Sequence, residues 1–130
     1  MSADLTPDEL AFLQSAFELA RNGETAQLVE YVDAGLPVNL TNSSGDTLLI
    51  LAAYYKHGEL VGALLDRGAD HARVNDRGQT ALAAAVFRQD ASTVRALLDA
   101  GADPELGPKS AVEIARFFDL PAMLELLGRP

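Results

Sequence analysis

Two segments of the chain recur at a fixed offset of 33 residues, and this repetition constrains the fold more than any other feature. Residues 45–49 (GDTLL) return as residues 78–82 (GQTAL), and residues 64–70 (LLDRGAD) return as residues 97–103 (LLDAGAD). A period of this length, with glycines and apolar pairs in register, is typical of stacked helical repeats. Such a scaffold presents a long surface rather than a pocket, so the pattern favours the binding of a partner.

The same register extends in both directions along the chain. One period earlier, Gly68 corresponds to Gly35 and Val61 to Leu28, and residues 110–115 match residues 80–85 at an offset of 30. We therefore predict a single domain, residues 1–130, built from four repeats at about 7–41, 42–74, 75–106 and 107–128. The last repeat is shortened.

Local signals within one copy predict two helices. Thr47 is a good N-cap for the apolar segment that follows it, because its hydroxyl can accept a hydrogen bond from an early backbone N–H. Apolar residues at helical spacing in 60–65 form a second segment, and Gly68 then provides the left-handed conformation that ends a helix. Between copies, residues 42–45 (NSSG) and 75–78 (NDRG) predict tight turns, which we call the fingers.

Both ends of the chain carry signals of terminal caps. Thr6, Pro7 and Glu9 form a capping-box pattern at the start of a helix that runs to about Arg21. Pro121 opens a short final helix. Polar outer faces on terminal repeats are expected of a solenoid.

The second and third copies match the ankyrin-repeat pattern closely, and the chain resembles that family. The matching residues are Gly45, Thr47, Leu49, Ala52, Ala53, His57, Leu64, Leu65, Gly68, Ala69 and Asp70 in the second copy, and Gly78, Thr80, Leu82, Ala85, Val94, Leu97, Leu98, Gly101, Ala102 and Asp103 in the third. The resemblance implies an all-α solenoid of helix-turn-helix repeats with short hairpin-like fingers, in which the terminal repeats act as caps. Lys56 and Gln89 stand where the pattern has Gly, so we expect non-Gly residues with left-handed backbone there.

Composition and charge narrow the class of partner. The formal net charge of −9 argues against nucleic acid, whose binding needs clustered Lys and Arg. The sequence contains no apolar run of membrane-spanning length and no pattern of a signal peptide, so we expect a cytoplasmic protein without a membrane partner. Another protein is the expected partner, and the chain itself is expected to be a monomer.

No constellation of residues points to catalysis. The sequence lacks a nucleophile elbow, a glycine-rich phosphate loop, a His-Glu metal motif and any cysteine. His57 occupies the position where the family has a His between its two helices, which favours a structural role. His71 is expected to be solvated. We therefore predict that the chain is not an enzyme and that it holds neither a cofactor nor a metal ion.

Aromatic residues gather in one register of the repeat, at the end of the first helix. In proteins that resemble this one, that register lines a concave groove beside the fingers. Aromatic and Arg side chains are frequent anchors of interfaces, so we predict an adaptor or inhibitor that binds its partner protein through the groove and the finger tips. The predicted partner-binding residues are Arg21, Ser43, Ser44, Asp46, Tyr54, Tyr55, Asp76, Arg77, Gln79, Phe87, Arg88, Phe117 and Phe118.

Two alternatives stay open at this point. One member of each aromatic pair could pack between repeats as core rather than face the groove. The chain could also be an accessory factor that handles haem or a metal ion for a partner enzyme, with Tyr54, Tyr55 and His57 as the candidate ligands.

Overall fold

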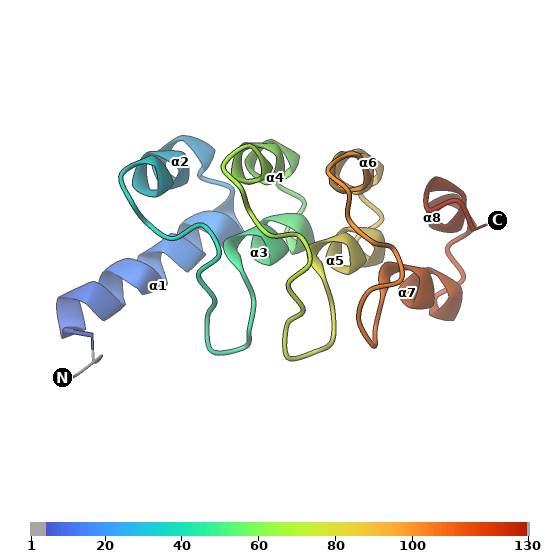
Figure 1. The fold of residues 1–130 in the computed structure, drawn as a ribbon, viewed down its shortest axis with the longest axis horizontal. Helices are drawn as coiled ribbons and strands as arrows, with labels where there is room; N and C mark the ends of the chain where they lie inside the picture. Colours follow the sequence, from blue (N-terminus) through green and yellow to red (C-terminus); the bar gives the residue numbers. More distant parts are fainter. Residues whose placement is uncertain (1–4, 130) are drawn as a thin grey trace.

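The computed structural model describes residues 5–129, and within this range the regular elements are helices. In chain order they are α1 (Pro7–Asn22), α2 (Thr25–Asp33), α3 (Leu48–Tyr54), α4 (Gly58–Leu65), α5 (Ala81–Phe87), α6 (Ala91–Asp99), α7 (Ala111–Phe117) and α8 (Pro121–Leu126). Figure 1 shows two layers, an inner layer of odd-numbered helices and an outer layer of even-numbered ones. One helix pair lies within each of the four expected repeat ranges, and the predicted all-α solenoid is confirmed.

Each inner helix begins at a side-chain cap. Thr47, Thr80 and Ser110 precede α3, α5 and α7, and each hydroxyl accepts a hydrogen bond from the backbone N–H three residues later, at 3.0, 3.1 and 3.2 Å. At α1 the predicted capping box is present, because the Thr6 hydroxyl accepts from the Glu9 N–H and the Glu9 carboxylate accepts from the Thr6 N–H. These caps satisfy backbone donors that a helix start leaves open.

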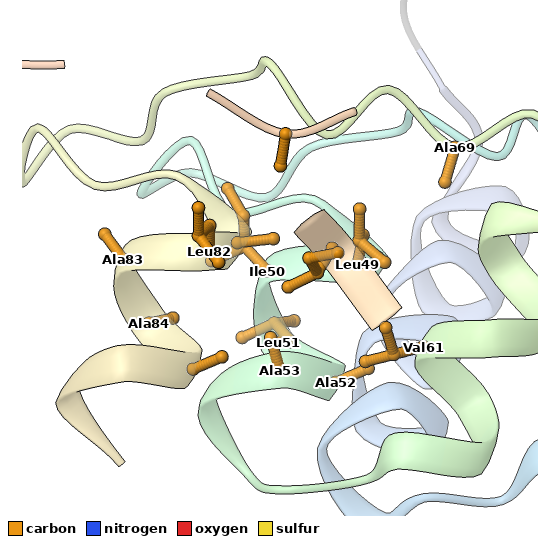
Figure 2. Close-up of a cluster of buried hydrophobic side chains, with 14 of the residues drawn as sticks. Leu49, Ile50, Leu51, Ala52, Ala53, Val61, Ala69, Leu82, Ala83 and Ala84 are labelled. Carbon is orange, nitrogen blue, oxygen red and sulfur yellow. The ribbon is translucent and has the colours of Figure 1, made fainter. Parts of the chain in front are cut away.

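The core runs along the interface between the two layers and between successive inner helices. Ala52, Ala53, Ala84 and Ala85 are fully or almost fully buried, and their small side chains let α3 and α5 pack closely. Figure 2 shows the larger residues of this cluster, Leu49, Ile50 and Leu82, together with Val61 from α4. Neither layer would bury its apolar face alone, so the stack itself provides the hydrophobic stabilisation.

A left-handed residue follows each inner helix. The position is occupied by Gly23 (φ 71°), Lys56 (φ 68°), Gln89 (φ 56°) and Asp119 (φ 53°) in the four copies. The expectation for Lys56 and Gln89 is confirmed, and the fourth copy repeats it. For a residue with a Cβ this conformation costs about 1–2 kcal/mol.

The fingers project from the inner layer as predicted (Figure 1). In the first finger the Gly45 N–H donates to the Asn42 carbonyl at 3.0 Å, while Asn42 Oδ1 accepts from the backbone N–H groups of Ser44 and Asp46. Asn75 makes the equivalent bonds in the second finger. Asn therefore fixes each turn through both its backbone and its side chain.

An ion pair joins α2 of the first repeat to the turn after α4 in the second. The Arg67 guanidinium donates to Asp33 through Nε at 2.8 Å and through Nη2 at 3.3 Å. This hydrogen-bonded pair lowers the pKa of the Asp33 carboxyl below its ordinary value.

Candidate functional site

Five aromatic side chains form a continuous ridge along the inner layer. Neighbouring ring centroids lie 5.1 Å apart for Tyr55 and Tyr54, 6.1 Å for Tyr54 and Phe87, 5.5 Å for Phe87 and Phe118, and 4.9 Å for Phe118 and Phe117. Three of these contacts are edge-to-face, and Tyr54 and Phe87 lie nearly parallel at 8°. We call these five residues the aromatic ridge; its rings come from the second, third and fourth repeats.

The ridge is open to solvent. Tyr55, Phe87, Phe118 and Phe117 are 42%, 39%, 49% and 82% exposed, and Tyr54 is half-buried. None of the five is buried, so the alternative in which one member of each pair packs as core applies at most to Tyr54, which is half-buried against the core. They lie at or just after the ends of α3, α5 and α7, directly before the left-handed residues Lys56, Gln89 and Asp119 or one residue earlier.

Arg88 contacts Tyr54 of the aromatic ridge in two ways. Its Nη1 donates to the Tyr54 carbonyl at 2.8 Å, and its guanidinium carbon lies 5.2 Å from the centroid of the Tyr54 ring. A cation over an aromatic face is attracted by the ring quadrupole. Arg88 therefore fixes Tyr54 and links the second repeat to the third.

Three adjoining hollows lie along the inner layer, and the aromatic ridge lines the second and third of them. The first, about 910 Å³, lies between α1 and the first finger; the second, about 490 Å³, lies beside the first two fingers; and the third, about 370 Å³, lies between the second finger and α7. The first two share Arg21, Asn42 and Ser44, and the last two share Gln79 and Phe87. The shared residues make the hollows one groove along the inner layer.

Apolar residues in α1 and just before it line the groove, and the sequence analysis did not predict them. Leu5 and Leu10 are 50% and 48% exposed, and together with Leu13 they line the first hollow. The spacing of Leu10, Leu13 and Phe17 predicts one apolar helix face. That face continues past the first finger, since α1 is 16 residues long and α3 only 7.

The predicted finger residues do not all behave alike. Ser43, Ser44, Asp76 and Arg77 are exposed, and Gln79 is half-buried in the walls of two hollows. These positions are accessible to a partner.

The expected placement of Asp46 is wrong. Its side chain is only 6% exposed and accepts a hydrogen bond from Asn75 Nδ2 at 2.8 Å, with Arg77 Nη2 at 3.4 Å. Asp46 thus joins the first finger to the second, because a buried carboxylate needs such donors. We exclude it from the proposed contact surface.

Arg21 lies where the first two hollows meet. Its Nη1 donates to Glu18 at 2.9 Å, and 32% of its side chain is exposed. The guanidinium carries five N–H donors, so this single bond leaves others for a ligand.

The two histidines serve contacts between repeats. His57 Nε2 lies 2.6 Å from the Arg21 carbonyl, and its ring covers Gly23, where an added Cβ would lie 2.5 Å from Nδ1. His71 is half-buried rather than solvated, since its Nε2 lies 3.1 Å from the Ala100 carbonyl in the next repeat. The prediction of a solvated His71 is wrong because the outer loops of adjacent repeats approach each other.

The groove brings together apolar, aromatic and cationic groups but no set of titratable ligands. Within residues 5–129, no group of three or more His, Cys, Asp or Glu side chains is arranged to hold a metal ion. In the same range, no helix combines the length and apolar character needed to cross a bilayer. The arrangement is suited to contact with another molecule along its length.

Comparison with known proteins agrees with this geometry. A family model described as ankyrin repeats in three copies matches residues 16–107. The chain belongs to the ankyrin-repeat family. Ankyrin repeats are generally protein-interaction modules, and the fold is not a catalytic one.

A Pseudomonas aeruginosa protein named as an ankyrin repeat protein is similar to part of this chain. The two are 40% identical over 58 residues, which cover 45% of this chain and 34% of that protein. This chain therefore matches about a third of the length of its curated relative.

Proposed function

We propose that this ankyrin-repeat chain is an adaptor or inhibitor that holds a partner protein in the groove and against the finger tips. The observation that carries the proposal is the aromatic ridge, because large rings that stay exposed along a recess are the residues that most often anchor interfaces. Exposed fingers add polar contacts at the rim through Ser43, Ser44, Asp76 and Arg77. Such a rim around an apolar centre is the usual anatomy of an interface.

The ligand-handling alternative receives no support from the geometry. His57 Nε2 is already engaged by the Arg21 carbonyl, and the His57 ring packs on Gly23. Tyr54 is held by Arg88. We therefore do not put forward a haem or metal function.

Affinity capture with paired variants tests the proposal. The bait Tyr55→Ala/Phe87→Ala removes two exposed rings and little core, and Arg95→Ala on the outer helix α6 is the control. Proteins that bind through the groove should be captured by wild type and Arg95→Ala but lost from the double variant, as measured by quantitative mass spectrometry and then with purified partner. Equal capture by all three baits, with circular dichroism showing intact helices, would reject the groove as the binding site.

A further inference from the structure

The middle hollow presents accessible positive charge and hides its negative charge. The side chains of Arg21 and Arg77 line this hollow and are 32% and 56% exposed, whereas the Asp46 side chain is only 6% exposed. A partner in this hollow therefore meets two guanidinium groups, while Asp46, the carboxylate in its lining, is buried; Glu18, the exposed ion-pair partner of Arg21, lines the first hollow. This local charge is opposite in sign to the net charge of −9 for the whole chain.

Both guanidinium groups have N–H donors that make no hydrogen bond within residues 5–129 and could bind a ligand. Arg21 is bonded to Glu18 through Nη1 alone, in an exposed pair of the kind that contributes little to stability. Arg77 makes one contact with Asp46, and at 3.4 Å that contact is long. Arg recognises carboxylates through two parallel N–H bonds, so a carboxylate on the partner suits either site.

The hollows on each side are mainly apolar, with Glu18 at the edge of the first and Lys109 and Glu113 at the edge of the third. Leu5, Leu10 and Leu13 line the first hollow, and Ile114, Phe117 and Phe118 line the third. Large apolar side chains of the partner would be removed from water there. The groove therefore alternates apolar, cationic and apolar along its length.

The repeat spacing sets the distance between these features. Packed helices lie about 8–10 Å apart, and the hollows follow successive inner helices, so neighbouring hollows are about 10 Å apart. An extended peptide rises about 3.3 Å per residue. One hollow thus corresponds to about three residues of the ligand.

We propose that the groove binds an extended peptide segment of a partner protein in which Asp or Glu has a large apolar residue about three positions away on either side. This inference rests on the proposed function and adds the chemistry of the partner. The acidic residue lies between Arg21 and Arg77, and the apolar residues fill the outer hollows. The aromatic ridge lines the middle and third hollows.

Peptide selection tests the inference without a known partner. A random twelve-residue peptide library displayed on phage is selected against the whole chain, and enriched peptides are counter-screened on the Tyr55→Ala/Phe87→Ala variant to identify those that use the groove. We expect these peptides to share the apolar, acidic, apolar pattern. Replacing their acidic residue by Lys should weaken binding about tenfold, the effect of losing one charge-assisted contact of about 1.4 kcal/mol.

A matched pair of double variants separates local from overall charge. Arg21→Gln/Arg77→Gln and Arg73→Gln/Arg95→Gln change the net charge equally, but only the first pair lies in the groove. In the first double variant the ratio of the affinities for acidic and Lys-substituted peptides should fall from about ten to about one. The second double variant should preserve the tenfold ratio. Equal loss in both pairs would overturn the inference.

The outcomes also distinguish this inference from the proposed function. Groove-dependent peptides that lack an acidic residue, or that carry a basic one at the centre, overturn the inference and leave the binding function in place. A selection in which no enriched peptide depends on the groove overturns both.

Discussion

Replacing Asp46 by Ala should destabilise the fold, because it removes a buried hydrogen bond between the first two fingers. In the structure Asp46 is 4% exposed and accepts a bond from Asn75 Nδ2 at 2.8 Å, and Asn75 is itself only 6% exposed. The substitution leaves that amide donor buried without a partner, which costs about 1–3 kcal/mol. The Arg77 contact is long and Arg77 is exposed, so its loss adds little. Both turn bonds to Asn75 Oδ1 survive.

Urea unfolding followed by circular dichroism measures this effect. We expect a loss of about 2 kcal/mol, equivalent to a fall in Tm of about 6–8 °C for a domain of this size. Asp76→Ala is the matched control, because it removes the same charge from an exposed position in the adjoining finger and should cost less than about 0.5 kcal/mol. If the two variants unfolded at the same urea concentration, the buried bond between the fingers would not contribute as argued.

Three further predictions follow from single features of the structure. Lys56→Gly should stabilise the fold by up to about 1 kcal/mol in urea unfolding, because Gly tolerates the φ of 68° there, whereas Lys56→Ala should bring no such gain. Arg67→Gln should raise the pKa of Asp33 toward 3.8 in an NMR titration, and an unchanged pKa would exclude the hydrogen-bonded pair in solution. Because the pKa of Asp33 is lower in the folded state than in the unfolded state, the pair stabilises the fold above the unfolded-state pKa of 3.8, and this contribution is lost as the pH falls through the folded-state pKa. Gly23→Ala should cost more than the roughly 1 kcal/mol of left-handed strain, because its Cβ would also lie 2.5 Å from the His57 ring; a loss no larger than that strain would mean that the ring moves aside freely.

The repeat architecture could be predicted from sequence because its signals are local and periodic. The 33-residue offset gives the repeat length directly. The N-cap Thr47 and the turn residues Asn42 and Asn75 form hydrogen bonds with residues two to four positions away, and these bonds are found as expected. The left-handed turns at Lys56 and Gln89 were expected from the resemblance to the ankyrin repeat, whose pattern has Gly at both positions. Periodicity also placed the aromatics in one register.

The parts that escaped prediction depend on contacts between repeats. Asp46 looks like an exposed finger residue until Asn75, 29 positions later, is brought against it. His71 is half-buried only because Ala100 approaches from the next copy. The spacing of Leu10, Leu13 and Phe17 indicates an apolar face of α1, but only the structure shows that this face lines a hollow beside the first finger.

The stacking order carries a consequence for cooperativity. The main helix contacts join each repeat to itself and to the adjacent repeats, so local opening at one end does not require the other end to yield. A partner lying along all three hollows would contact both α1 in the first repeat and α7 in the fourth, and so would connect repeats that are not adjacent. Opening of either terminal repeat would then also break contacts with the bound partner. Binding would therefore make the unfolding of the four repeats more cooperative.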